Sequence, residues 1–252
     1  MGKIKIGTQL FSLRRYLQEE ENVPQVFAKV KEMGAEVVQV SGMCAIDSKK
    51  LGEISKQYEL PICITHSPVD RIKNDLDKLA EEHLDYDCKN IGIGMMPSEY
   101  RANEDGLKSF IELLNETSTK LAKYDMTIAY HNHHFEFNKY GDRIIYDIMI
   151  ENTDKAVQFI PDTYWIKVGG YVPQDYIKKL TGRINTLHLK DYKKTLGVPL
   201  FRAVGKGDID FVDILKVAEE AGVENAVVEL DFSLKPYKSM EYSLNYLKKI
   251  YP

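Results

Sequence analysis

The sequence predicts a single α/β domain, a (β/α)₈ or TIM barrel over residues 1–252, from three observations. Eight short β-branched runs start about 26 to 42 residues apart, the length of a strand, a crossover helix and two loops. Several runs are apolar on both faces, as parallel strands covered by helices should be. A length of 252 residues fits eight such units, and no Ser/Pro-rich linker interrupts them. A doubly wound open sheet is the alternative.

The expected strands follow one another along the whole chain, near residues 4–9, 36–40, 62–66, 90–94, 126–131, 157–161, 184–189 and 226–230. Between them lie residues that typically begin or end helices. Pro24 and Gly34 frame one helix, Asp210 and Gly222 frame another, and the longest apolar helical pattern lies near 103–124. Gly92-Ile93-Gly94 lacks the third glycine of a dinucleotide fingerprint and Gly205-Lys206-Gly207 is no phosphate loop, so neither favours the open sheet or a nucleotide.

Composition and charge exclude several classes of protein. With 34 Lys+Arg against 38 Asp+Glu, the net charge of −4 argues against a nucleic-acid binder. No run of about 18 apolar residues predicts a membrane span, and no signal peptide is recognised, although a leader removed earlier would leave no trace. Cys44, Cys63 and Cys88 are widely spaced, which favours buried thiols in a reducing compartment. We expect a cytoplasmic protein without membrane partners; its oligomeric state stays open.

Titratable side chains gather where the expected strands end. In a parallel barrel the active site lies at the carboxyl ends of the strands. Five of the six histidines fall there, and only His83 lies in a helical stretch. The acids at these ends are Glu136, Asp162, Asp191, Glu229 and Asp231. Histidine nitrogens and carboxylate oxygens on one rim form a cage suited to Mn²⁺, Zn²⁺, Co²⁺ or Mg²⁺, so a divalent metal is expected.

The order of several motifs carries a family resemblance. They are residues 6–14, 157–165, 188–191, 205–211 and 228–231, and they resemble successive motifs of the xylose-isomerase-like TIM barrels. This is the sugar phosphate isomerase/epimerase superfamily, which includes apurinic endonucleases, ketose 3-epimerases and inosose dehydratases. Residues 130–137 are similar to a subgroup with the pattern Tyr-His-Asn-His-x-Phe-Glu-Phe. The resemblance covers essentially the whole chain.

The resemblance implies a metal held by an acid ending strand five, an Asp ending strand six, a His ending strand seven and a Glu ending strand eight. The last three correspond to Asp162, His188 and Glu229. His131 stands where the usual strand-five Glu is expected and is the preferred fourth ligand, with Glu136 or His133 as the alternatives.

By the same resemblance, the chain is expected to be a sugar isomerase or epimerase that moves a proton beside a carbonyl of a small sugar, keto-sugar or polyol. In the ketose epimerases, glutamates of strands five and eight are the two bases, so His131 departs from that pattern. Glu229, His131 or Glu136 would move the proton. The alternatives are a dehydratase similar to inosose dehydratase and a non-catalytic sugar-binding barrel. A nuclease is disfavoured by the charge and by Trp165, which replaces a second strand-six histidine.

Further residues are candidates for substrate contact. Lys190 lies two residues after His188 and is either an electrophilic contact or a solvated rim lysine. His66 is expected either to touch the substrate or to orient a neighbouring ligand. His133 is expected to touch the substrate, whereas Trp165 and Phe11 either face a sugar ring or pack in the core. Arg202 is a candidate partner for an anionic substituent. No convincing phosphate cradle is found.

Overall fold

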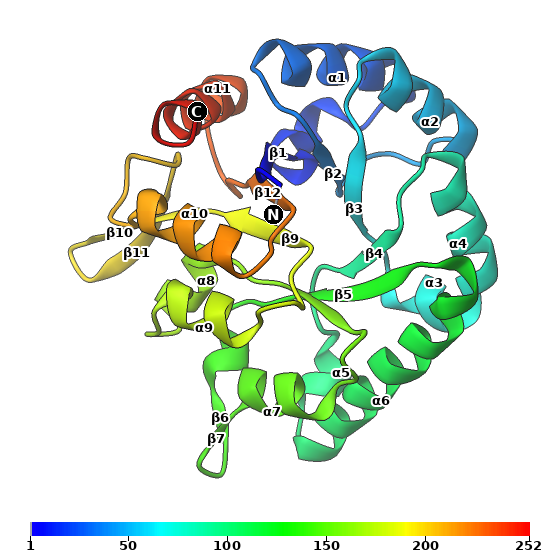
Figure 1. The fold of residues 1–252 in the computed structure, drawn as a ribbon, viewed down its shortest axis with the longest axis vertical. Coiled ribbons are helices and arrows are strands. Elements are labelled where there is room, and N and C mark those ends of the chain that lie inside the picture. Colours follow the sequence, from blue (N-terminus) through cyan, green and yellow to red (C-terminus); the bar gives the residue numbers. More distant parts are fainter. Residues whose placement is uncertain (1) are drawn as a thin grey trace.

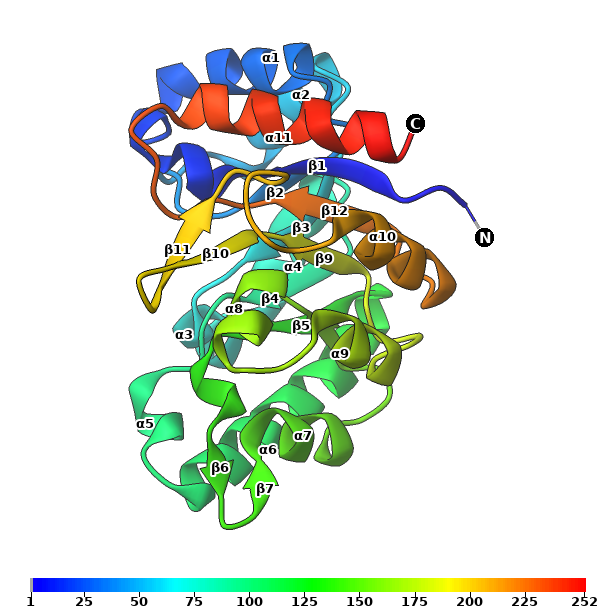
Figure 2. The same ribbon diagram turned by 90° about the vertical axis from the view of Figure 1, so that its left-hand side faces the viewer.

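The computed structural model describes residues 2–252 and shows a ring of parallel strands surrounded by helices (Figures 1 and 2). The eight barrel strands are β1 Lys5–Gln9, β2 Val38–Val40, β3 Ile62–His66, β4 Asn90–Ile93, β5 Thr127–His131, β8 Gln158–Ile160, β9 Thr186–Leu189 and β12 Asn225–Val228. Each overlaps an expected strand. The (β/α)₈ prediction is therefore confirmed, and the open sheet is wrong.

The sheet runs in the order β8-β5-β4-β3-β2-β1-β12-β9, so β8 and β9 are the two strands that must meet to close the ring. They meet at their carboxyl ends. The backbone N–H of His188 donates to the carbonyl of Pro161 at 2.9 Å, and a parallel bridge pairs Asp162 with His188. Near the other end, the N–H of Phe159 donates to the carbonyl of Arg183 at 2.8 Å.

The helices lie outside the ring. They are α1 Val23–Glu32, α2 Ser48–Gln57, α3 Val69–Asn74, α4 Leu76–Asp85, α5 Ser98–Arg101, α6 Glu104–Leu121, α7 Ile145–Asn152, α8 Thr163–Val168, α9 Pro173–Lys179, α10 Phe211–Glu220 and α11 Pro236–Ile250. Short 3₁₀ turns are η1 Leu10–Tyr16, η2 Glu20–Asn22, η3 Ala122–Tyr124 and η4 Phe135–Phe137. No helix within residues 2–252 combines the length and the apolar character that crossing a bilayer requires.

The expected helix signals act as predicted. The Asp210 carboxylate accepts from the N–H groups of Val212 and Asp213 at 3.0 and 3.2 Å, and Gly222 follows α10 with φ of 81°. Apolar side chains of the helices pack against the outside of the strands in one large core. A second cluster contains no helix residue and fills the inside of the ring: Val37, Cys63, Ile64, Ala129, Ile160 and Val227.

Two hairpins extend the loops at the carboxyl ends of the barrel strands and were absent from the sequence prediction. The strands β6 Lys139–Tyr140 and β7 Arg143–Ile144 follow β5, and β10 Asp191–Thr195 pairs with β11 Val198–Arg202 after β9. Figure 2 shows β10 and β11 projecting from the side of the barrel where the strands end.

A buried carboxylate organises the loop that follows β11. Asp191 is fully buried and accepts backbone N–H groups of Tyr192 at 2.8 Å, Gly205 at 2.9 Å and Gly207 at 2.7 Å. A Cβ at Gly207 would lie 2.2 Å from Asp191 Oδ1, so only glycine fits there. The glycine pair therefore cradles a carboxylate of its own chain, which gives this motif its structural role.

Asp191→Ala should lower the free energy of unfolding by about 3 kcal/mol, because several N–H donors lose a charged acceptor together. Urea unfolding measures the change. Asp208→Ala is the matched control, since this exposed acid lies in the same loop, and it should change stability by less than about 0.5 kcal/mol. Equal losses in the two variants would contradict the anchoring role.

Candidate functional site

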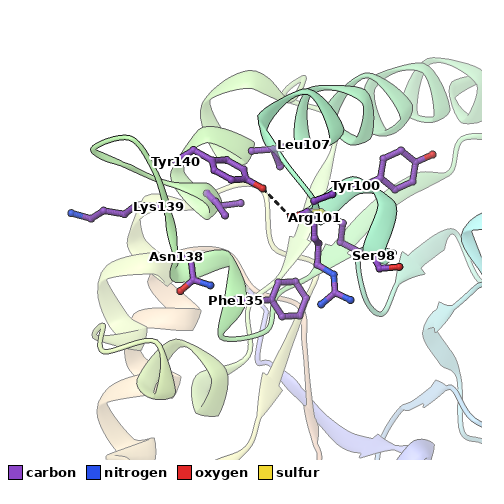
Figure 3. A pocket seen from close by; sticks show the side chains of 11 residues that line it. Ser98, Tyr100, Arg101, Leu107, Phe135, Asn138, Lys139 and Tyr140 are labelled. Atoms are coloured by element: carbon purple, nitrogen blue, oxygen red, sulfur yellow. Dashed lines mark hydrogen bonds between the residues drawn. The ribbon is translucent and has the colours of Figure 1, made fainter.

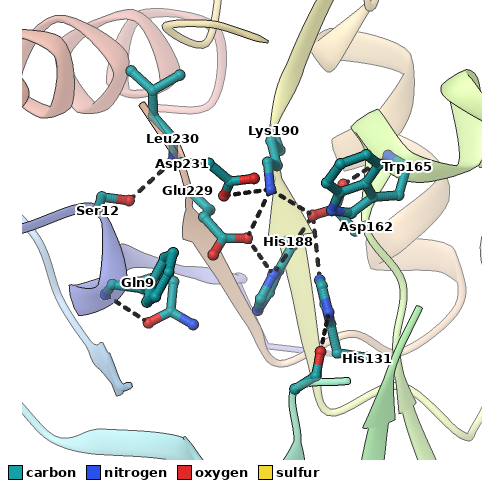
Figure 4. A network of polar contacts seen from close by, with 12 residues as sticks. Gln9, Ser12, His131, Asp162, Trp165, His188, Lys190, Glu229, Leu230 and Asp231 are labelled. Carbon is teal, nitrogen blue, oxygen red and sulfur yellow. Dashed lines mark hydrogen bonds and ion pairs between the residues drawn. The ribbon is translucent and has the colours of Figure 1, made fainter. Parts of the chain in front are cut away.

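Four of the expected site residues meet at the carboxyl end of the barrel (Figure 4). His131 ends β5, Asp162 follows β8, His188 lies in β9 and Glu229 follows β12. One ligand atom from each lies within 4.8 Å of the others. The exposed fractions of the four residues are 3%, 0%, 0% and 5%, so the group is almost fully shielded from water.

The two oxygens of Asp162 have different tasks. Oδ1 accepts the backbone N–H of Trp165 at 3.0 Å and so caps helix α8. Oδ2 faces the group of four and lies 3.3 Å from His131 Nε2 and 3.8 Å from His188 Nδ1. The hydrogen bond of the cap fixes the orientation of the carboxylate. Asp162 can therefore cap α8 with one oxygen and direct the other at the group of four.

Each histidine of the group is oriented by an acceptor on its far side. His131 Nδ1 lies 3.0 Å from the carbonyl oxygen of Gly94, which can only accept, so this nitrogen carries the hydrogen. His188 Nε2 lies 2.6 Å from Gln39 Oε1 in the same way. The other nitrogens, His131 Nε2 and His188 Nδ1, therefore direct a lone pair at Asp162 and Glu229. Carboxylates do not donate, so this arrangement needs a cation or a proton between them.

Lys190 supplies one positive charge beside the group. Its side chain is 1% exposed, and Nζ lies 2.6 Å from Asp231 Oδ1, 3.4 Å from Glu229 Oε2 and 3.8 Å from Asp162 Oδ2. Burial opposes its charge, but these carboxylates outweigh burial and raise the pKa of Lys190. The interpretation of Lys190 as a solvated rim lysine is wrong, because the barrel mouth encloses it.

The charges of the site do not balance without a further cation. Asp162, Glu229 and Asp231 bring three carboxylates against one ammonium. Burial alone would lower the pKa of His188, but the charge of Glu229 and the contact with Asp162 raise it to about 9. A proton on His188 therefore supplies part of the missing charge when nothing else does. A buried set of donors with excess negative charge is chemically suited to a divalent cation.

Three carboxamides around the group share one pattern that the sequence analysis missed. Gln9, Gln39 and Asn132 are fully buried. Their oxygens are engaged: Gln9 accepts from Phe11 N–H at 3.1 Å, Gln39 from His188 and Asn132 from Asp162 N–H at 3.1 Å. Each amide nitrogen has no hydrogen-bond partner within residues 2–252. Such buried donors are costly unless they have a ligand to bind.

Three expected substrate contacts lie beside the histidine pair. The ring of His66 lies 5.4 Å from that of His131, and His133 packs edge-on against His131 at 4.8 Å. Burial, together with the neighbouring His131, lowers the pKa of His66 and lowers that of His133 to about 3, so both rings are neutral at pH 7. The Trp165 ring lies 4.9 Å from Lys190 Nζ. Buried nitrogens without a partner are His66 Nε2, His133 Nδ1 and Trp165 Nε1.

Glu136 lies outside the group of four. It is fully buried, and its carboxylate accepts from the Tyr130 hydroxyl and, at 2.8 Å, from the backbone N–H of His133. Burial, opposed by these hydrogen bonds, raises its pKa from 4.5 to about 8. Glu136 thus fixes the loop that carries His133, and His131 is the strand-five residue that the structure brings to the group.

The remaining candidates lie at the edge of the site. Phe11 follows β1, is half-buried and lies under the Arg14 guanidinium at 4.1 Å. Arg202 ends β11, and its Nη1 donates to the carbonyl of Phe201 at 2.9 Å. Their roles in substrate binding stay predictions.

Comparison with known proteins places the chain in a family. Residues 27–250 match the model of the xylose isomerase-like TIM barrel family, and the chain belongs to it. A structure of a sugar phosphate isomerase/epimerase from Parabacteroides distasonis aligns with a TM-score of 0.81 and 22% identity, covering 100% of this chain and 96% of that one. The structure of 3-keto-D-glucoside 4-epimerase from E. coli aligns with a TM-score of 0.70 and 19% identity, covering 98% and 100%.

Among curated relatives, inosose dehydratase of Clostridium perfringens is 27% identical over 169 residues, which are 60% of this chain and 56% of the relative. The chain thus spans just over half the length of the curated relatives it matches. The family prediction is confirmed, and the relatives carry the names of enzymes, as the sequence analysis expects of this chain.

Glu136→Gln should remove a pH-dependent component of stability. Between about pH 5 and pH 8 the folded chain keeps a proton on Glu136 that the unfolded chain releases, so the free energy of unfolding falls as pH rises. The effect of this one group is at most about 1.4 kcal/mol per pH unit. Urea unfolding across this range should show a shallower decline in E136Q than in the wild type. The exposed variant Glu99→Gln should follow the wild type, and identical slopes in all three proteins would refute the buried proton.

Proposed function

We propose that the chain is a divalent-metal-dependent sugar isomerase or epimerase that transfers a proton next to a carbonyl. The observation that carries this proposal is the buried convergence of His131, Asp162, His188 and Glu229 with Lys190. The family membership and the names of the relatives support sugar chemistry at this end of the barrel.

The donor set fits a divalent cation. Three of the contacts among the candidate ligand atoms are 3.0 to 3.8 Å, near the separation of about 3.4 Å between tetrahedral ligands that each lie about 2.1 Å from an ion, and all four atoms lie within 4.8 Å of one another. His131, Asp162, His188 and Glu229 would hold the metal. A divalent cation bound there supplies Lewis acidity that polarises a carbonyl oxygen and acidifies the neighbouring C–H bond.

The chain's own groups then divide the proton chemistry. Burial raises the pKa of Glu229, but the charge of Lys190, with smaller contributions from neighbouring groups, outweighs burial and lowers it, so the carboxylate is ionised and can accept a proton from carbon. Lys190 Nζ, with three donors, can hydrogen-bond to the oxygen on which negative charge develops. The walls exclude water from the site, which strengthens both interactions.

The unpartnered donors favour an oxygen-rich, uncharged substrate. The amide nitrogens of Gln9, Gln39 and Asn132 can donate to hydroxyl or carbonyl oxygens, and Trp165 adds a flat face beside them. Lys190, the buried cation beside the group of four, faces three carboxylates, so even with a divalent cation the site would have no net positive charge to attract a phosphate. A neutral sugar, keto-sugar or polyol meets these requirements.

Dehydration of the same substrate class is the second candidate. The curated relative with this activity in its name is an inosose dehydratase, and the first step, loss of the proton beside a carbonyl, is shared. His131 replaces the strand-five glutamate of a symmetric two-base epimerase, which favours an asymmetric reaction. In a dehydration, Lys190 would protonate the departing hydroxyl group after Glu229 takes the carbon-bound proton.

His188→Ala and Glu229→Gln should each abolish turnover and weaken metal binding while the fold stays intact. The proteins are dialysed against chelator, reloaded with Mn²⁺ and analysed for bound metal. They are then incubated in D₂O with keto-sugars, inososes and ketoses. Deuterium should enter one carbon beside the carbonyl with the wild type only. His134→Ala, an exposed histidine of the same loop region, is the matched control and should keep both properties.

Full activity in either site variant would contradict the proposal, and so would a wild type that binds no divalent ion. A wild type that binds metal and sugar but exchanges no deuterium with any compound would instead identify a non-catalytic sugar-binding barrel.

Gln39→Leu should weaken metal binding about 10- to 100-fold, because His188 loses the acceptor that orients its ring. Gln39→Glu keeps an acceptor at that place and should retain more of the affinity. Competition with a chromogenic chelator measures both variants without turnover. Equal affinities in the wild type and Gln39→Leu would show that Gln39 does not orient His188.

A further inference from the structure

A cavity opens beside the proposed active centre, on the same face of the barrel. It has a volume of about 320 Å³, at the lower end of the range of small-molecule sites. One wall follows β4 and consists of α5 and the start of α6; the other follows β5 and includes η4 and the β6–β7 hairpin (Figure 3). Both walls therefore belong to loops at the carboxyl ends of strands.

The cavity borders the centre through two stacked rings. Phe135 lines the cavity, and its ring lies parallel to that of His133, with an interplanar angle of 5° and centroids 5.4 Å apart. His133 in turn packs edge-on against His131. These ring contacts therefore connect the cavity to the group of four.

Hydrogen bonds hold the walls in place. The Tyr140 hydroxyl donates to the carbonyl of Arg101 at 3.0 Å and joins the hairpin to α5. On the inner side, the N–H of Met96 donates to the Tyr130 hydroxyl at 3.3 Å, and that hydroxyl donates to Glu136 of η4. The buried Tyr130 hydroxyl thus binds one residue of each wall, Met96 and Glu136. The walls are therefore held together by hydrogen bonds, and the cavity is not a gap between independent loops.

The lining is graded from apolar to cationic. Met96 and Leu107 are each 1% exposed and form the deep part, with the half-buried Phe135, Tyr140 and Ile145 around them. The exposed residues at the mouth include Arg101 and Lys139. No acidic residue lines the cavity within residues 2–252. The Arg101 guanidinium lies over the Phe135 ring at 4.4 Å, whereas Figure 3 shows Lys139 pointing away from both.

We propose that this cavity is a binding site for a flat aromatic carboxylate. The ring would lie on the apolar floor beside Phe135, and the carboxylate would pair with the Arg101 guanidinium at the mouth. The apolar side chains of the floor favour an uncharged ring, the Arg101 guanidinium favours a carboxylate, and the absence of acids from the described lining removes repulsion. The site uses none of the candidate metal ligands, so it stands independently of the proposed reaction.

The test measures direct binding of 4-fluorobenzoate to the full chain, with ¹⁹F NMR of the probe as the readout. A ligand of this size should bind with a dissociation constant on the order of 1 mM. The neutral 4-fluorobenzyl alcohol should bind at least about fivefold more weakly, because it lacks the charge-assisted bond. His188→Ala should bind the probe as the wild type does. The binding result therefore does not depend on whether the proposed function is correct.

Arg101→Gln should weaken the binding of 4-fluorobenzoate at least about fivefold, so that the variant binds the carboxylate no more tightly than the alcohol. Lys139→Gln removes the same charge from a side chain that points to solvent and should change binding by less than about twofold. The proposal is overturned if the probe does not bind below about 10 mM, or if both variants bind it like the wild type.

The carboxylate has two possible sources, either a part of the substrate or a separate ligand. Competitive inhibition of deuterium exchange by 4-fluorobenzoate would assign the site to the substrate. A change in the maximal exchange rate without competition would assign it to a separate ligand.

Discussion

The cost of burying negative charge is the constraint on which the site depends. Asp162 and Glu229 lie in the barrel mouth with 0% and 5% of their surface exposed, and Asp231 joins them through Lys190. Carboxylates placed together away from water require compensation, and several neighbours of the group provide some of it. Lys190 gives a full charge, the helix α8 amide satisfies one oxygen of Asp162, and the two histidines present lone pairs that only a proton or a metal can satisfy.

The closure of the barrel and the geometry of the site are one feature. Strands β8 and β9 meet through the bridge between Asp162 and His188, so the last contact that closes the ring also sets the distance between two candidate ligands. Thr163 adds to the same seam, because its hydroxyl bonds to the backbone of Lys190. Any change that loosens this seam would move a carboxylate, an imidazole and an ammonium together. The geometry of the site therefore depends on the closure of the barrel.

The sequence predicted the parts of this arrangement that follow from periodicity and order. Strand spacing placed His131, Asp162, His188 and Glu229 at strand ends, and parallel strands bring such ends to one rim. Strand spacing could not identify Gln39, because nothing in its local sequence distinguishes it from other buried strand residues. Its role depends on contact with His188, which is 149 positions away in sequence. The β10–β11 hairpin was missed for a related reason: Asp191 and the glycines that hold it gain meaning only through contacts across 14 to 16 residues.

The histidine at position 131 agrees with the charge of the whole site. Three carboxylates surround Lys190, so one ammonium and one divalent cation together would neutralise them. The glutamate that the family resemblance places at the end of strand five would add a fourth carboxylate and leave one buried charge without compensation. The nearby acid, Glu136, is instead turned toward Tyr130, where burial raises its pKa to about 8 and allows it to stay neutral. With an imidazole ligand in place of a base, the two faces of a bound substrate would meet different groups, and an asymmetric proton transfer is the chemistry such a site supports best.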